Sequence, residues 1–579
     1  MERAAIDPDK TRGPIADLNR RLVEAVLRPL DLGSGVETGE ILKALVADLA
    51  QDTEGWAERQ TRYYRKQLEL WAHYVLPGRE APSQPLVAPE AGDRRFRAQE
   101  WRSAPYFEYL AQSYLLSAQW LKETAAAARL EPRTKRKLEF CARQLVDAMS
   151  PANFPWSNPE ALKRAADTRG ESVARGLRTL ASDLDKGMIS MTDEGAFEVG
   201  RNLAVTAGAV IFENELMQLI QYRPATGTVF ERPLLMVPPC INKYYILDLQ
   251  PENSFVRFAL EQGHTVFMVS WRNVPHELGR TTWDDYLERG VMRSIDAAAE
   301  ACATDRINAL GFCVGGTLLG SALAVMRAKG VDRVASVTLL ASMLDFKDTG
   351  ELGVFVDEAY VRGRERDFAE GGLLHGRELA ITFASLRANE LIWHYVVNNY
   401  LKGDAPEPFD LLYWNADSAN LPGAMYAYYV RNMYLENNLR VPGKLSMCRA
   451  PVDLGKVDMP AYVLATRDDH IVPWKTAYAS MRLLGGKMQF VLGASGHVAG
   501  VINPASRNRR NYWVNPAAEP DPERWLAGAT SQPGSWWMHW ARWLAPLSGG
   551  QVLARAQLGG ARYMEIELAP GRYVKERGN

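Results

Sequence analysis

The chain has 579 residues and a nearly even charge balance, with 68 Lys and Arg against 69 Asp and Glu. This balance excludes a strong global attraction to nucleic acid or to an anionic membrane surface. Apolar residues make up 47% and charged residues 24%, as in ordinary folded proteins, and the length favours two domains.

The cysteines and the first residues predict a cytoplasmic protein with free thiols. The five cysteines are scattered, and none forms a Cys-x-x-Cys pair typical of a zinc site or a disulfide framework. Residues 1–7 lack the apolar core of a secretory signal. Residues 307–326 carry no charge and could span a bilayer by length, but their four glycines and a change of pattern favour a buried strand, a turn and a buried helix. We therefore expect no transmembrane segment.

Residues 1–200 predict a mainly helical N-terminal domain. Apolar residues recur every fourth position in residues 41–49, and residues 106–121 have helical spacing too. Residues 80–95 and 150–159 are rich in proline and predict loops. The aromatic side chains of residues 106–121 favour core packing, with an apolar face for a partner or a lipid-like surface as the alternative. We expect this domain to make dimer, granule or partner contacts.

Residues 201–579 predict an α/β catalytic domain. A helical pattern over residues 198–222 leads into it. Six short apolar runs follow, separated by segments of helical length, which is typical of a mostly parallel sheet with helices on both faces. Residues 345–439 interrupt this rhythm, and we expect them to form a lid over the carboxyl ends of the strands. The six runs are residues 234–237, 265–271, 307–310, 334–340, 461–465 and 488–492.

The third run ends in Gly311-Phe312-Cys313-Val314-Gly315, which resembles the nucleophile elbow of α/β-hydrolases with Cys in place of Ser. In such an elbow the nucleophile lies at a sharp turn from a strand into a helix. Gly311 and Gly315 leave room where backbone segments crowd together. The N-terminus of the following helix favours a thiolate. The alternative is a buried cysteine in a glycine-rich turn.

A thiol nucleophile needs a base, and the base needs an orienting acid. In α/β-hydrolases the chain order is nucleophile, acid, His. His497 follows the last apolar run, in the loop where this fold places its base, whereas His470 is the main alternative. Asp469 fits the Asp-x-x-Val-Pro register of the acid loop, and Asp468 does not. The sequence therefore predicts Cys313 as nucleophile, His497 as base and Asp469 as acid.

An oxyanion hole needs two N–H donors. Val314 is expected to supply one, because it follows the nucleophile. Ile241, in the loop after residues 234–237, is expected to supply the other, and its neighbour Cys240 to be structural. The chain has no metal-ligand spacing, no Gly-x-Gly-x-x-Gly motif and no Walker A motif, so metal, dinucleotide and ATP chemistry are not indicated.

Most of the chain is similar to the class I polyhydroxyalkanoate synthases, which have the α/β-hydrolase fold. The long N-terminal domain resembles that of the homodimeric type. Phe312 and Val314 favour class I over the medium-chain class. The matching segments are residues 311–316 for the elbow, 238–249 for the oxyanion loop, 469–474 for the acid loop, 493–504 for the histidine loop and 153–159 in the first domain.

This resemblance implies an acyltransferase that polymerises (R)-3-hydroxyacyl-CoA, of the short-chain kind such as 3-hydroxybutyryl-CoA, into a polyester and releases CoA. The acyl group would be held on Cys313 as a thioester. CoA is part of the substrate and a product, so no separate cofactor is implied. The implied partners are the growing polyester chain, a second copy of the chain and granule-associated phasins, at the surface of polyester granules in the cytoplasm. Trp414 and Asp417 match a lid motif of the family and are expected near the pocket or the lid.

Two other functions are compatible with parts of the sequence. A cysteine-dependent thioesterase or depolymerase of the same fold would release free acid without making polymer. A non-catalytic granule-coat protein would use the aromatic N-terminal residues to bind polyester. The spacing of Cys313, Asp469 and His497 argues against the coat protein, because such a protein has no need of the three together.

Overall fold

The computed structural model describes residues 36–75, 85–517 and 519–578, and the first 35 residues lie outside this description. The chain divides into two compact units. The first comprises Met1–Asp193 and Ile381–Glu407, and the second comprises Glu194–Ala380 and Pro408–Asn579. Residues 381–407 lie within the segment expected to form the lid, and they belong to the first unit.

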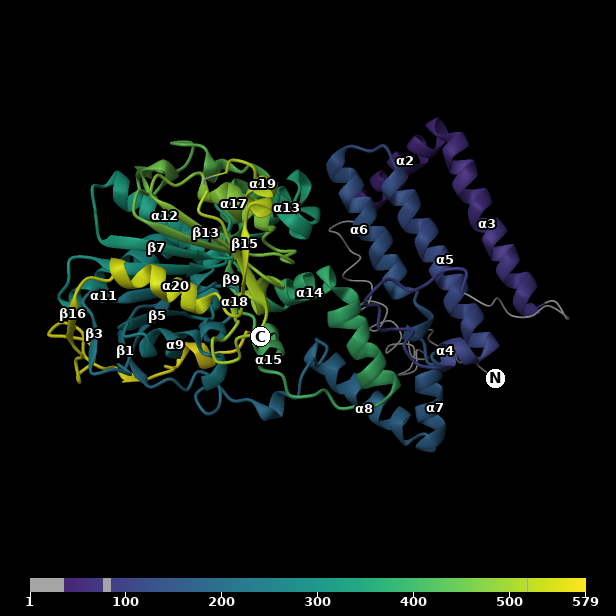
Figure 1. Ribbon diagram of the computed structural model, residues 1–579, viewed down its shortest axis with the longest axis horizontal. Coiled ribbons are helices and arrows are strands. Elements are labelled where there is room, and N and C mark those ends of the chain that lie inside the picture. The colour runs from purple at the N-terminus through teal and green to yellow at the C-terminus, as the bar shows by residue number, and fades with distance from the viewer. Residues whose placement is uncertain (1–35, 76–84, 518, 579) are drawn as a thin grey trace, which may run out of the picture. The chain divides into compact units, whose positions relative to one another are not determined.

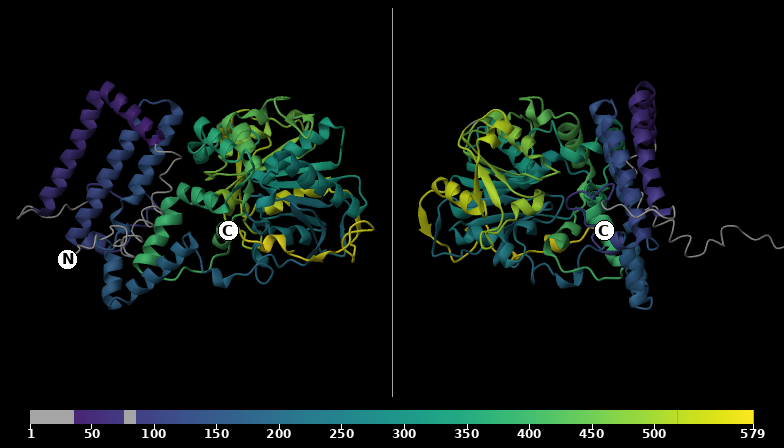
Figure 2. Two further views of the ribbon diagram at one scale, coloured as in Figure 1. Left: turned by 180° about the vertical axis from the view of Figure 1, so that it is seen from behind. Right: turned by 45° about the vertical axis from the view of Figure 1, so that its right-hand side comes forward.

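The first unit is helical where the structure describes it, as the sequence predicts (Figure 1). Several helices begin with a proline at the first helical position, where the missing N–H costs nothing. The carboxylate of Glu131 accepts the N–H groups of Arg133 and Thr134 and so caps α6. Helices α3 and α5 lie side by side, as both views of Figure 2 show. The helices are α2 (Val36–Gln51), α3 (Thr53–Val75), α4 (Glu100–Ser103), α5 (Pro105–Ala127), α6 (Pro132–Ala148), α7 (Pro159–Asp167) and α8 (Glu171–Lys186), with π-helices η9 (Asn389–Trp393) and η10 (Val396–Leu401).

The second unit is built on a sheet in which eleven of the described strands pair in the order β15-β14-β13-β12-β7-β6-β4-β5-β2-β1-β17. The strands from β13 to β5 in this order are parallel, and the outer pairs are antiparallel. The six apolar runs predicted as strands are confirmed as β4, β5, β6, β7, β12 and β13. The strands are β1 (Gly208–Glu213), β2 (Met217–Tyr222), β3 (Thr228–Phe230), β4 (Leu234–Val237), β5 (Val266–Trp271), β6 (Ile307–Phe312), β7 (Val334–Leu340), β8 (Leu373–Leu374), β9 (Leu421–Pro422), β10 (Ser446–Met447), β11 (Ala450–Pro451), β12 (Ala461–Thr466), β13 (Met488–Gly493), β14 (Asn511–Val514), β15 (Thr530–Pro533), β16 (Gln551–Leu553) and β17 (Glu567–Leu568).

The helix expected over residues 198–222 is wrong, because residues 208–222 form the antiparallel pair β1 and β2 with the turn between them. Every residue of β2 is buried, so its sequence lacks the alternation that marks a half-exposed strand. The turn is set by Asn214, whose side-chain oxygen accepts the N–H groups of Leu216 and Met217.

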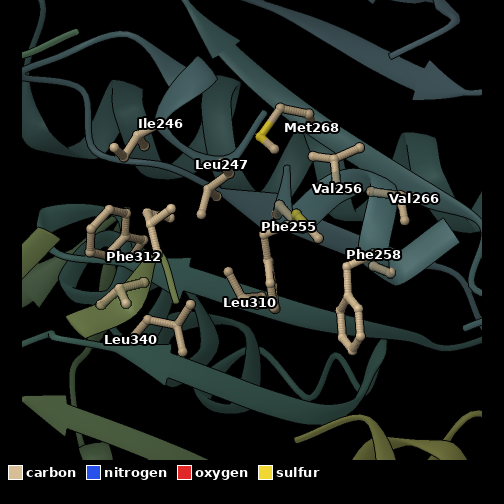
Figure 3. Packing of buried hydrophobic residues seen from close by; sticks show 14 of the residues in the cluster. Ile246, Leu247, Phe255, Val256, Phe258, Val266, Met268, Leu310, Phe312 and Leu340 are labelled. Atoms are coloured by element: carbon tan, nitrogen blue, oxygen red, sulfur yellow. The ribbon is translucent and has the colours of Figure 1, made fainter. Parts of the chain in front are cut away.

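Helices cover the sheet and bury a large apolar core. Helices α9, α12 and α17 contact β5, β6 and β12. Figure 3 shows Phe255 and Phe258 of α9 beside Leu310 of β6 within this core. Trp540 of α20 packs on Phe255 with ring centroids 4.9 Å apart, and its indole donates to Thr338 Oγ1 at 3.0 Å.

The remaining helices lie between or after the strands. Residues 307–326 form β6, a turn and α12, which confirms the prediction of a strand followed by a helix. Among the described residues, no helix combines the length and the apolar character that crossing a membrane requires. The helices are α9 (Phe255–Glu261), α10 (Trp283–Asp285), α11 (Arg293–Cys302), α12 (Val314–Ala328), α13 (Glu358–Asp367), α14 (Gly376–Leu386), α15 (Asp410–Ala416), α16 (Gly423–Tyr429), α17 (Trp474–Met481), α18 (His497–Val501), α19 (Pro522–Ala527) and α20 (Trp537–Leu544).

Candidate active site

Cys313 lies at the tip of the turn between β6 and α12. Its backbone has φ of 54° and ψ of −128°, a conformation that side-chain-bearing residues seldom adopt. The N–H of Cys313 donates to the carbonyl of Leu340 in the neighbouring strand β7 at 2.9 Å. The sheet therefore holds Cys313 in a strained conformation, as is common for residues at functional sites.

The glycines around Cys313 are required because the turn leaves no room for a side chain. A Cβ on Gly311 would lie 2.5 Å from the Cα of Gly316. A Cβ on Gly315 would lie 2.3 Å from the carbonyl oxygen of Val237, at the end of β4. The elbow therefore contacts the start of the loop that follows β4.

Replacing Gly315 with Ala should lower the free energy of unfolding by about 1 to 3 kcal/mol, because backbone atoms surround the added methyl group. Gly363→Ala, inside α13, is the matched control, because no atom lies within 4 Å of the place where the added Cβ would be. Gly363→Ala should stabilise the protein by roughly 0.5 to 1 kcal/mol. Urea unfolding of both variants measures the difference, and equal stabilities would contradict the crowding at the elbow.

His497, the first residue of α18 after β13, lies beside Asp469, in the loop after β12. His497 Nδ1 is 2.7 Å from Asp469 Oδ2, and both side chains are buried. The other carboxylate oxygen, Oδ1, accepts the N–H groups of Ile471 and Val472 at 2.9 and 2.8 Å. These bonds fix the carboxylate so that Oδ2 faces the imidazole. An Nδ1–H donated to Asp469 leaves Nε2 available as a proton acceptor.

His497 interacts with the side chain of Cys313 as well. Burial lowers the pKa of His497, but the Asp469 carboxylate and the Cys313 side chain outweigh burial and raise this pKa well above its usual value. The Cys313 side chain is within hydrogen-bonding reach of His497. The imidazole also stacks on Phe312, with ring centroids 5.6 Å apart. The structure thus brings the three predicted catalytic residues together.

Replacing Asp469 with Asn should lower the pKa of His497, because the carboxylate that raises it is removed. The neutral thiol and imidazole are in equilibrium with a thiolate and an imidazolium, so a lower His497 pKa reduces the fraction of thiolate. At neutral pH the alkylation of Cys313 by iodoacetamide should slow by about tenfold for each unit by which the pKa falls. The turnover number should fall roughly 10³- to 10⁴-fold. An unchanged alkylation rate would show that Asp469 does not act through His497.

Val314 and Ile241, the residues expected to form the oxyanion hole, belong to the two segments that meet at the elbow. Val314 is the first residue of α12, so its N–H has no acceptor within the helix. Ile241 lies in the loop after β4, and its carbonyl accepts the N–H of Ala419 at 2.8 Å. Cys240 beside it is buried, which raises the pKa of its thiol to about 12, and it lies close enough to Cys313 for an electrostatic interaction.

Trp414 and Asp417 contact the loop that carries Ile241. The Trp414 indole donates to the carbonyl of Lys243 at 2.7 Å. The Asp417 carboxylate accepts the hydroxyl of Tyr245 at 2.9 Å. Both residues therefore hold the end of the loop after β4.

Two tyrosines near Cys313 were missed by the sequence reasoning. Tyr429 and Tyr434 lie in α16 and in the π-helix η11 (Val430–Leu435) that follows. Burial raises the pKa of each hydroxyl, and an electrostatic interaction with Cys313 acts in the same direction. Aromatic residues are dense in this part of the sequence, but no local pattern relates these two to the elbow. Both buried hydroxyls therefore lie within electrostatic range of the nucleophile.

The fold and this geometry define an α/β-hydrolase with a cysteine at the nucleophile position. A family model described as the N-terminus of poly-beta-hydroxybutyrate polymerase (PhaC) matches residues 92–259, and one described as the alpha/beta hydrolase fold matches residues 233–504. The chain is 53% identical to the Cupriavidus necator protein named poly(3-hydroxyalkanoate) polymerase subunit PhaC, over 90% of this chain and 88% of that protein. The chain belongs to the poly(3-hydroxyalkanoate) polymerase family.

Other relatives are similar over nearly their whole length. The Methylorubrum extorquens poly(3-hydroxyalkanoate) polymerase is 40% identical over 95% of this chain and 92% of its own. The Rhizobium meliloti protein named poly(3-hydroxyalkanoate) polymerase subunit PhaC is 38% identical, over 96% of this chain and 93% of that protein. Among solved structures, a monoacylglycerol lipase from Paleococcus ferrophilus is 12% identical with a TM-score of 0.32, covering 57% of this chain and 99% of that one.

Proposed function

We propose that this enzyme is an acyltransferase that polymerises (R)-3-hydroxyacyl-CoA, of the short-chain kind such as 3-hydroxybutyryl-CoA, into a polyester and releases CoA. One observation carries the proposal. The buried pair of His497 and Asp469, 2.7 Å apart, lies beside Cys313 in a chain that is 53% identical to a poly(3-hydroxyalkanoate) polymerase subunit.

In the first step the Cys313 thiolate attacks the thioester carbonyl of the substrate. His497 accepts the thiol proton, and Asp469 stabilises the resulting imidazolium. The N–H groups of Val314 and Ile241 are proposed to bind the oxyanion. The carbon–sulfur bond to CoA then breaks, and the proton passes from His497 to the departing CoA sulfur.

In the second step the acyl group moves from Cys313 to the 3-hydroxyl group of another unit. His497, neutral again, accepts the hydroxyl proton as the oxygen attacks the acyl-Cys313 thioester. The new ester bond forms, the bond to sulfur breaks, and the proton returns to Cys313. The first step exchanges one thioester for another at little cost, and the second forms a more stable oxygen ester. A cysteine therefore keeps the acyl group activated until a hydroxyl accepts it.

We further propose that the lid, residues 345–439, excludes water and that the protein acts as a homodimer at the surface of polyester granules in the cytoplasm, with phasins as further partners. Apolar side chains on α3 support a surface role for the N-terminal domain, residues 1–200. Tyr64, Leu68 and Trp71 are 55%, 66% and 43% exposed, which is unusual for large apolar residues close together on one helix.

The assay for this function supplies the purified full-length protein with 3-hydroxybutyryl-CoA. We expect release of CoA thiol together with polymer that is soluble in chloroform. Thiol release with free acid and no polymer would instead identify a thioesterase of the same fold. Absence of thiol release would favour a granule-coat protein.

A further inference from the structure

Lys243 is a buried lysine at the end of the loop after β4, and the mechanism above does not use it. The residue is only 2% exposed. Its ammonium group donates to the backbone carbonyl of Glu576 and interacts with the carboxylate of Asp417. Burial lowers the pKa of Lys243, and the positive charge of Arg577 adds to this effect, whereas the carboxylates of Asp417 and Glu576 partly oppose it. A buried cation is costly unless acceptors and an opposite charge surround it, so these partners make the site suitable for a charge.

Asp417, one of these two partners, directly follows α15. Beyond the Trp414 and Asp417 contacts described above, the side chain of Asn242 donates to Ser418 Oγ at 3.2 Å. Asn242 and Ser418 also pair as an isolated antiparallel bridge. Together with the bond from Ala419 to Ile241, these contacts tie residues 414–419 to residues 241–245.

Glu576, the other partner, lies near the end of the chain, 333 positions after Lys243. Arg577 donates to the Tyr413 hydroxyl at 3.1 Å, and the Arg577 carbonyl accepts the side-chain amide of Asn273 at 2.9 Å. The same Asn273 accepts the N–H of Asn420 at 2.9 Å. The ammonium of Lys243 therefore lies where three segments meet.

We propose that Lys243 is a positioning residue for acyl transfer. By holding residues 414–419 and Glu576 against the loop after β4, it keeps the N–H of Ile241 where the oxyanion forms. Only one residue separates Lys243 from Ile241, so a displaced lysine shifts the donor directly. This inference rests on the proposed function, because the oxyanion arises only during acyl transfer.

The test compares two reactions of Cys313 in the full-length protein. Alkylation by iodoacetamide needs the thiolate but forms no oxyanion, whereas CoA release from 3-hydroxybutyryl-CoA needs both. Lys243→Met keeps an unbranched side chain of nearly the same length and removes the ammonium group. It should lower the turnover number by about 10- to 100-fold, leave KM within about threefold, and leave the alkylation rate within about twofold.

Two further variants complete the design. Asp417→Asn removes the negative charge beside Lys243 and should also lower the turnover number. This variant keeps the proposal testable if Lys243→Met fails to fold. Lys329→Met, the same change at an exposed lysine directly after α12, is the control and should have the activity of the unmodified protein. Equal losses of alkylation and CoA release in Lys243→Met, or an unchanged turnover number, would overturn the proposal.

Amide hydrogen exchange separates this inference from the proposed function. Residues 238–247 should exchange faster in Lys243→Met than in the unmodified protein or in Lys329→Met. If the unmodified protein released no CoA, the proposed function would be wrong. The amide exchange rates of residues 238–247 would still show whether Lys243 holds this loop in place. Unchanged exchange in Lys243→Met would show that the lysine does not hold it.

Discussion

Cys313→Ala should lower the rate of CoA release by about 10⁵-fold or more and abolish polymer formation, because no other group can carry the acyl chain. The fold should persist, because the alanine side chain is smaller than that of cysteine and the backbone strain at φ 54° is similar for both residues. The measurement is thiol release and chloroform-soluble polymer with 3-hydroxybutyryl-CoA, beside a thermal unfolding curve. Activity near that of the unmodified enzyme would refute the nucleophile assignment.

The variant Cys313→Ser distinguishes the role of sulfur from that of a nucleophile in general. The serine hydroxyl would form an oxygen ester at the first step, and transfer to the next hydroxyl would then gain no free energy. We expect residual CoA release without a corresponding yield of polymer. Polymer yield in proportion to CoA release would contradict the argument that the thioester keeps the chain activated.

His497→Gln should cause a loss of about 10⁴- to 10⁶-fold in turnover, because the thiol and the incoming hydroxyl both lose their proton acceptor. The alkylation of Cys313 at neutral pH should slow as well, since the imidazolium no longer stabilises the thiolate. Both rates are measured on the same preparation of enzyme.

The neighbouring histidine provides the matched control. His470 follows Asp469 directly, and its carbonyl accepts the N–H of Glu351 at 3.3 Å. His470→Gln should keep activity within about twofold of the unmodified enzyme, as expected for a side chain outside the reaction. If instead only His470→Gln abolished acyl transfer, His497 would be the wrong base.

The parallel core of the sheet could be predicted from the sequence, but its outer strands could not. Runs such as residues 234–237 and 461–465 are short, continuous and apolar, and a proline precedes each of them, which is typical of buried parallel strands. Residues 208–222 are also largely apolar, yet their spacing imitates a helix. Only the pairing of β2 with β5, a contact between distant segments, makes them strands.

The position of Cys313 was predictable because local backbone geometry imposes its motif. The glycines are forced by contacts of under 3 Å around a single turn, so their spacing can be read directly from the sequence. Lys243 lies in the segment predicted as the oxyanion loop, but the sequence did not indicate that its side chain is buried beside Asp417 and Glu576. Tyr429 and Tyr434 were not identified as neighbours of the site. Their proximity to Cys313 depends on packing between segments distant in the sequence, and no periodicity in the sequence encodes it.

The contact between Lys243 and the carbonyl of Glu576 has a consequence for the timing of synthesis. The two residues are 333 positions apart, which a ribosome covers in roughly 20 to 70 s at about 5 to 20 residues per second. For most of that interval, once residue 313 has been added, Cys313 exists, but the loop that positions the oxyanion donor lacks its last anchor. A nascent chain would therefore hold the nucleophile without an efficient polymerase, and polymerisation would reach its full rate only after translation has passed residue 576.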